Sequence, residues 1–163
     1  MTIGLAPLFA DQGRLDAHIH ENHNLDYPTT RQRRILALLV ELGELANETR
    51  AFKFWSLKGP SPIEKILDEY ADGMHFFLSL GIDVGSLKKD YEISKPDGVL
   101  VAAFLKTYEY VIKFRADPRH ETYEAAFQTY LDIIPLLNST PDDIIKAYYA
   151  KLGVNYQRQQ NKY

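Results

Sequence analysis

The stretch that decides the fold is residues 35–48, which read ILALLVELGELANE. Its apolar residues recur at spacings of three and four, and this periodicity predicts an amphipathic helix. The apolar stripe consists of Ile35, Leu38, Leu39, Leu42 and Ala46. Glu41, Glu44 and Glu48 lie together on the opposite side, but Leu36, Val40 and Leu45 flank them. The helix is therefore apolar on nearly all sides. Its acidic side chains do not form the continuous polar surface of an ordinary solvated helix face.

A second stretch, residues 61–80, repeats this arrangement. Ser61 followed by Pro62 is a helix start signal, and we expect the helix to end before Gly81. Its apolar stripe consists of Ile63, Ile66, Leu67, Tyr70, Met74 and Phe77. Glu69 and Asp72 face away from that stripe, three residues apart. Because the residues after Tyr70 are almost all apolar, Asp72 is expected to lie in apolar surroundings.

Helical periodicity also dominates the rest of the chain, and strand patterns are scarce. We predict six helical segments, at about residues 5–22, 28–52, 61–80, 98–115, 118–137 and 140–160. Thr140 and Asp143 resemble a capping box at the start of the last segment. Residues 81–97 form the one long connection, and no linker divides the chain. The expected architecture is an all-α helical bundle in one domain, residues 1–163.

Composition excludes several classes of function. The chain has 163 residues, a net charge of −3 and no cysteine. The charge offers no broad basic surface for nucleic acid or an anionic membrane, and no thiolate is available for catalysis or metal binding. The longest apolar run, residues 35–40, is too short to span a bilayer, and residues 1–15 lack the pattern of a secretory signal. We expect a cytoplasmic enzyme or binding protein.

The two acidic pairs suggest a metal site. Unpaired carboxylates are costly to bury, but hard cations between them remove the penalty. Carboxylate oxygens suit Mg²⁺, and two antiparallel helices that each offer two acids at a spacing of three can form such a site in a bundle core. The alternative is two solvated helix faces, with Lys65 paired to Glu69.

Other candidate residues also allow two interpretations. His75 follows Asp72 by three residues, and it is either a core histidine or a substrate contact beside the metal. Trp55, the only tryptophan, is either a core residue or a platform for a base. Lys151 and Arg158 form either a solvated basic face or a phosphate site, where arginine can bind in a bidentate manner.

Several motifs resemble a known family. They are Glu41-Leu42-Gly43-Glu44, then Phe52-Lys53-Phe54-Trp55, then Asp68-Glu69-Tyr70-Ala71-Asp72 with His75. Residues 12–19, QGRLDAHI, resemble the first helix of that family, and residues 151–159, KLGVNYQRQ, with Tyr163 following, resemble its last motif. The family is that of the dimeric all-α dUTP pyrophosphatases, within the MazG-like nucleotide pyrophosphohydrolases. The matches run in family order from residue 12 to residue 163.

The resemblance implies hydrolysis of dUTP to dUMP and pyrophosphate, and of dUDP to dUMP and phosphate, with two or three Mg²⁺ ions. It implies the metal ligands Glu41, Glu44, Glu69 and Asp72, with Glu41 also the general base. For the substrate it implies contacts from Gln12 or Asp16, Lys53, Trp55, His75, Lys151, Asn155 and Arg158. Of these, Lys53, Lys151 and Arg158 would contact phosphate, and Asn155 the base or sugar.

Two rival functions remain open at this point. One is a related enzyme with another substrate, such as dCTP or a damaged nucleotide. The other is a helical interaction protein without activity, whose acidic residues lie on the surface. The resemblance and the aromatic residues of the later helices predict a homodimer.

Overall fold

The computed structural model describes residues 1–94 and 98–162. Within them it contains the helices α1 (Ala6–His23), α2 (Tyr27–Thr49), α3 (Ile63–Asp83), α4 (Leu100–Ala116), α5 (His120–Leu131) and α6 (Pro141–Gln160), and a short 3₁₀ helix, Ile134–Leu137. The predicted all-α bundle of six helices is confirmed. Residues 95–97 of the predicted long connection and Tyr163 of the last motif lie outside the described residues.

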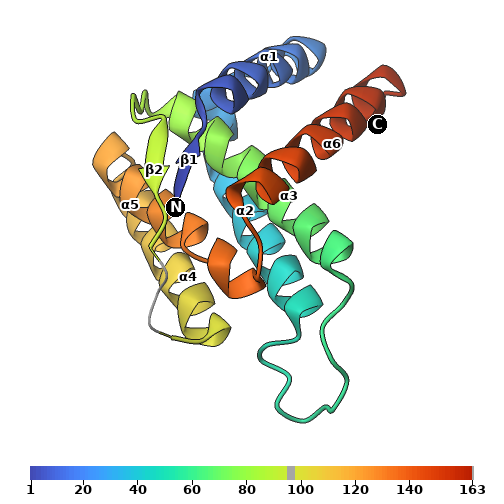
Figure 1. The fold of residues 1–163 in the computed structure, drawn as a ribbon. Coiled ribbons are helices and arrows are strands. Elements are labelled where there is room, and N and C mark those ends of the chain that lie inside the picture. The colour runs from blue at the N-terminus through green and yellow to red at the C-terminus, as the bar shows by residue number, and fades with distance from the viewer. Residues whose placement is uncertain (95–97, 163) are drawn as a thin grey trace.

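The antiparallel pair α2 and α3 is the centre of the bundle (Figure 1). Leu38 and Leu42 of the apolar stripe of α2, and Leu45 beside it, are fully buried. The second half of α3 is buried nearly all round, as its apolar sequence predicts. Glu41 of α2 nevertheless lies close to Glu69 and Asp72 of α3, at the seam between the two helices.

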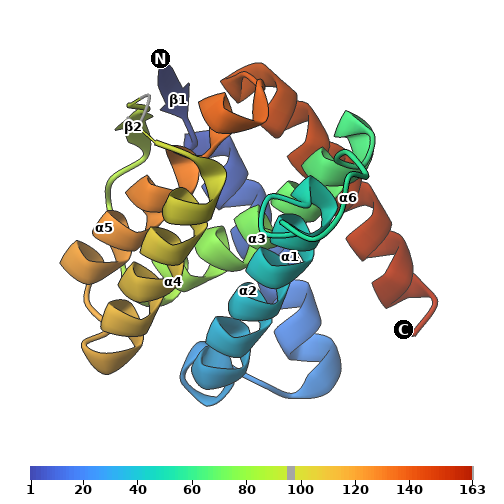
Figure 2. The same ribbon diagram turned by 90° about the horizontal axis from the view of Figure 1, so that it is seen from below.

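Helices α1 and α6 pack against α3, while α4 packs against both α2 and α5 (Figure 2). Tyr70 of α3 and Tyr130 of α5 tie their two helices together. Their rings stack at 4.2 Å, and each hydroxyl donates to the other residue's backbone carbonyl oxygen, at 2.9 and 2.7 Å. The side of the α2–α3 pair that faces α1 and α6 is the one that carries the polar residues described below.

A small antiparallel sheet, absent from the prediction, joins β1 (Thr2–Gly4) to β2 (Asp90–Glu92). Ile3 pairs with Tyr91, and both side chains are buried. Three residues are too few for an alternating pattern to be recognised, so the sequence gives no signal for these strands.

Three predicted helix ends were wrong. α2 ends at Thr49 rather than near residue 52, because Arg50 adopts a left-handed conformation with φ 56°. α3 continues through Gly81 to Asp83. α5 ends at Leu131, and the short 3₁₀ helix, which contains Pro135, follows it.

The helix start signals had mixed outcomes. The capping box of Thr140 and Asp143 is confirmed. Ser61 does not cap α3, since its hydroxyl donates to the Glu48 carboxylate instead. α2 begins before its predicted start, with Asp26 accepting a hydrogen bond from the Thr29 amide. None of the helices in residues 1–94 and 98–162 is both long enough and apolar enough to cross a membrane.

Candidate functional site

Three carboxylates from two helices meet at the α2–α3 seam. Glu41 extends from α2, and Glu69 and Asp72 extend from α3, where their spacing of three residues places both on one face. One oxygen from each lies within 4.8 Å of the others, and all three side chains are half-buried. This is a donor set that could hold a divalent metal ion.

The electrostatics of this cluster are unfavourable without a cation. The Oε2 atoms of Glu41 and Glu69 are buried and have no hydrogen-bond partner in the described protein. Burial, followed by the charges of Asp72 and Glu44, raises the pKa of Glu41 to about 8 and that of Glu69 to about 7. Glu44 is itself exposed, but it lies close enough to act on both.

The stability of the metal-free protein should therefore depend on pH. Between the ordinary glutamate pKa of 4.5 and the raised values, the folded protein binds more protons than the unfolded chain does. In EDTA, the free energy of unfolding is expected to decrease as the pH rises from about 5 to about 8. Urea denaturation at a series of pH values measures this trend. The Glu41→Gln variant should show a flatter decline, and an equally steep decline in that variant would contradict the explanation.

Lys151 of α6 supplies positive charge at the edge of the cluster. Its buried ammonium lies 3.2 Å from Asp72 Oδ2 and 2.9 Å from Asp68 Oδ1. Burial alone would lower the pKa of Lys151, but the hydrogen bond to Asp68 and the charge of Asp72 raise it above its ordinary value. The pKa of Asp72 is raised by burial, which outweighs the opposite effects of Lys151 and Arg158. Asp68 belongs to the Asp68–Asp72 motif of the sequence but is not among the predicted site residues.

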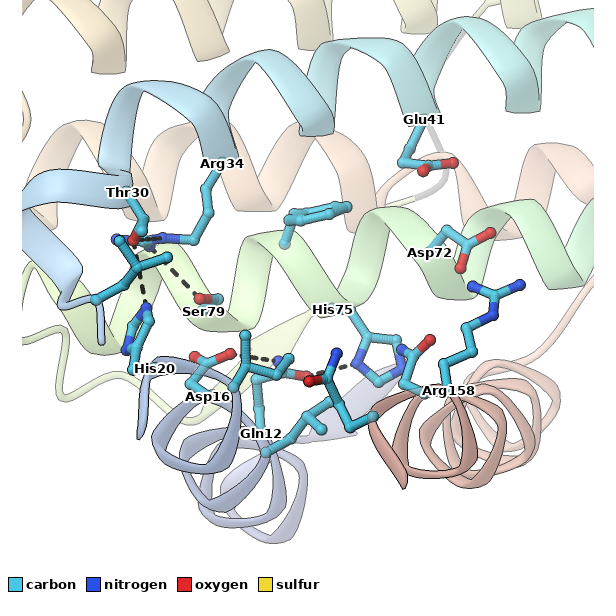
Figure 3. Close-up of a pocket in the computed structure, with 16 residues that line it drawn as sticks. Gln12, Asp16, His20, Thr30, Arg34, Glu41, Asp72, His75, Ser79 and Arg158 are labelled. Atoms are coloured by element: carbon cyan, nitrogen blue, oxygen red, sulfur yellow. Dashed lines mark hydrogen bonds between the residues drawn. The ribbon is translucent and has the colours of Figure 1, made fainter. Parts of the chain in front are cut away.

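A cavity of about 300 Å³ opens beside the carboxylates, between α1, α2, α3 and α6 (Figure 3). Seven of the predicted site residues line it, namely Gln12, Asp16, Glu41, Asp72, His75, Asn155 and Arg158. In Figure 3, Glu41, Asp72 and Arg158 lie at one end, and Gln12 and His75 lie between them and the other end. Two of the carboxylates, Glu41 and Asp72, therefore share one chamber with residues predicted to bind a base. Glu44, Glu69 and Lys151 are not part of its lining.

His75 is buried in the cavity wall and is uncharged. Its Nδ1 lies 2.6 Å from Gln12 Oε1, and its ring stacks on Tyr148 at 4.4 Å. Burial lowers the pKa of His75 to about 3. His75 is thus buried as a core histidine would be, and it also lines the cavity, while its contact with substrate stays a prediction.

The other end of the cavity contains polar residues that the sequence analysis missed. Arg34 Nε donates to Thr30 Oγ1 at 3.0 Å, and Arg34 also contacts Asp83 at 2.9 Å and Ser79 at 3.4 Å. A signal for them exists in the sequence. Thr30, Arg34 and Glu41 share one face of α2 at spacings of four and seven residues, and Ser79 continues the face of α3 that carries Asp72 and His75.

Lys53 and Trp55 do not line this cavity. They belong to the connection between α2 and α3, which extends beyond the ends of both helices in Figure 1. Trp55 is 65% exposed and packs edge-to-face on Phe54, with ring centroids 5.1 Å apart. It is thus not a core residue, and the substrate contacts expected of Lys53 and Trp55 stay predictions.

Comparison with known proteins gives one family match. A family model described as dUTPase matches residues 4–163, which is nearly the whole chain. A comparison with curated proteins finds no match.

Proposed function

Since the chain belongs to the all-α dUTPase family and is thus a hydrolase that acts on dUTP, we propose that the cluster of Glu41, Glu69 and Asp72 is the centre where it cleaves dUTP to dUMP and pyrophosphate with Mg²⁺. The observation that carries this proposal is the shared chamber. Glu41 and Asp72 line the same cavity as Gln12 and His75, and Glu69 completes the carboxylate cluster beside them. Glu41 and Glu69 each have a buried oxygen without a hydrogen-bond partner in the described residues. A nucleotide can then place its phosphates on the acidic end and its base near the histidine.

The donor chemistry fits the proposed ion. The family generally uses a divalent metal, and hard carboxylate oxygens suit Mg²⁺, which keeps several waters and takes phosphate oxygens as further ligands. Glu41, Glu69 and Asp72 would hold it, with Glu44 beside them. When bound, Mg²⁺ supplies neutralisation of phosphate charge and activation of a water molecule.

The chain's own residues would do the remaining work. Glu41, whose carboxylate has a buried oxygen without a partner, is proposed to accept the proton of the attacking water. Lys151 and Arg158 are proposed to bind phosphate oxygens, and Asn155 to contact the base or sugar. The same arrangement would cleave dUDP to dUMP and phosphate.

A panel of nucleotides tests the function. We expect the protein with Mg²⁺ to release pyrophosphate from dUTP and phosphate from dUDP, to act much more slowly on dCTP and dTTP, and to be inactive in EDTA. A higher kcat/KM for dCTP or another nucleotide than for dUTP would transfer the proposal to a related substrate. Full activity in EDTA would overturn the metal assignment.

We also propose that the protein forms a homodimer, as the family resemblance predicts. Exposed apolar side chains on α2 and α4 support this proposal. Leu36 on α2 and Leu105 on α4 are 63% and 65% exposed, and Val40 and Ile112 extend the same two helices' apolar surface. Leu36 and Ile112 line one shared hollow, and the two helices pack side by side. Apolar patches of this kind commonly mark protein interfaces.

Light scattering tests the assembly. The wild-type protein is expected to have about twice the chain mass of 18.7 kDa, and Leu36→Glu should shift it toward one chain mass, because the glutamate would be buried unpaired at the interface. Leu87→Glu is the control, since Leu87 is also an exposed leucine but lies on neither helix. A wild-type mass of one chain at micromolar concentration would contradict the dimer.

The cytoplasmic location is likewise a proposal. Fractionation of source cells with an antibody against the chain tests it.

A further inference from the structure

The ammonium group of Lys151 is enclosed by protein and shared between two carboxylates of α3. The Lys151 side chain is 7% exposed, and its Nζ lies 2.9 Å from Asp68 Oδ1 and 3.2 Å from Asp72 Oδ2. Asp68 and Asp72 are four residues apart, so they lie on one face of the helix in consecutive turns. Lys151 reaches them from α6, which packs against α3. One cation thus bridges two acids of a neighbouring helix.

The two acids differ in their surroundings. Asp72 is half-buried and belongs to the cluster with Glu41 and Glu69. The Asp68 side chain is 56% exposed and is not part of that cluster. The Lys151 ammonium therefore lies between the carboxylate cluster on one side and a more exposed carboxylate on the other.

Lys151 is also held away from the cavity. Figure 3 shows Arg158 beside Asp72 in the cavity wall, and Arg158 lines the cavity, whereas Lys151 does not. The two basic residues of α6 thus approach Asp72 differently. Arg158 faces the chamber, while Lys151 takes two carboxylates as its partners and supplies charge to the cluster from outside the chamber.

We infer that Lys151 is an internal counterion that competes with Mg²⁺ for Asp72, and that Asp68 is a positioning residue, which holds the ammonium beside the cluster when the metal takes Asp72. This inference rests on the proposed function, because it takes Asp72 as a metal ligand, and it extends that function to the charges that the metal must displace. An ammonium and a divalent cation repel each other at a shared carboxylate. Asp68 offers the ammonium a second partner, so Lys151 can give up Asp72 and still remain beside the metal, near the phosphates.

The two residues should therefore have opposite effects on metal affinity. Without the ammonium at position 151, Asp72 has one competing cation fewer, so a divalent metal binds more tightly. Without the carboxylate at position 68, Lys151 has only Asp72 as a partner and competes for it more strongly, so the metal binds more weakly. Residues that only supported the fold would weaken metal binding in both cases.

Titration of the nucleotide-free protein with Mn²⁺, in which EPR reports the free ion, tests the inference. Mn²⁺ takes the same hard oxygen ligands as Mg²⁺. We expect Lys151→Met to bind Mn²⁺ at least ~5-fold more tightly than the wild type and Asp68→Asn at least ~5-fold more weakly, which is the scale of one ion pair. Lys151→Gln is a second variant that removes the charge but keeps a hydrogen-bond donor for Asp72. Melting curves in EDTA show whether each variant is folded.

A double-mutant cycle shows whether Asp68 acts through Lys151. In the Lys151→Met background, Asp68→Asn should change the Mn²⁺ affinity less than ~2-fold, because the partner through which it acts is gone. Asp68→Glu should restore most of the wild-type affinity, since a longer carboxylate at this exposed position can still reach the ammonium. Lys146→Met on α6 and Glu64→Gln on α3 are the matched controls, because both residues are exposed and lie on the same two helices.

Two results would overturn the inference. One is that neither Lys151→Met nor Lys151→Gln binds Mn²⁺ more tightly than the wild type. The other is an effect of Asp68→Asn that is equally large with and without Lys151. Because the titration contains no nucleotide, either result is read separately from the nucleotide panel, which tests the proposed function.

Discussion

Glu41→Gln is expected to lower kcat/KM for dUTP at least ~100-fold, because it removes charge where several kcal/mol of transition-state stabilisation depend on it. Glutamine preserves the size and helix propensity of the side chain. It removes both a carboxylate of the proposed metal site and the proposed base. Steady-state kinetics over a range of Mg²⁺ concentrations measure the loss.

The same substitution should not damage the fold. Above its raised pKa of about 8, an ionised Glu41 is repelled by Asp72 and Glu44. Glutamine removes this repulsion, so in EDTA at such a pH Glu41→Gln is expected to melt at or above the wild-type temperature. Glu109→Gln on α4 is the control, since Glu109 is exposed and pairs only with Lys113 among the ion pairs of the described residues. If Glu41→Gln kept more than half of the wild-type activity at low Mg²⁺, the cluster would not be the metal centre.

Gly81→Ala is expected to destabilise the protein by about 1–3 kcal/mol, the usual cost of overpacking a core. A Cβ at position 81 would lie 2.5 Å from both Cζ and Oη of Tyr123, which is fully buried. The ring cannot move aside easily, because Phe77, Phe114 and Phe127 surround it. For a chain of this size, each kcal/mol corresponds to roughly 2–4 °C in Tm.

Gly153→Ala is the matched control for that experiment. Gly153 lies inside α6, and a Cβ there would meet nothing within 4 Å. Alanine is the better helix former, so this variant should be stabilised by about 0.5–1 kcal/mol. Equal melting temperatures for Gly81→Ala and the wild type would mean that the approach of α3 to Tyr123 is looser than the structure shows.

The sequence by itself determined the helices and the pairing of acids. Helical periodicity is a local property, so six segments follow from spacings of three and four residues, and the same spacing places Glu69 and Asp72 on one face of α3. The apolar residues that flank these acids in the sequence argued against a solvated helix face. The motifs, which occur in the same order as in the family, indicated the class of substrate. The helices and the paired acids can be inferred from residues that lie within a few helical turns of one another along the chain.

Contacts between distant segments decided the rest. Gly81 reads as a helix end, but α3 continues through it to Asp83. A glycine is needed there because a larger residue would meet Tyr123, which lies 42 positions further along the chain. Arg34 and Ser79 gained a place in the cavity wall only when α2 and α3 packed together. His75 of α3 likewise contacts Gln12 of α1, 63 positions away, only in the folded chain. These contacts depend on which side chains of different helices come together in the folded protein. The spacing of residues within one helix does not specify which residue of another helix it will contact.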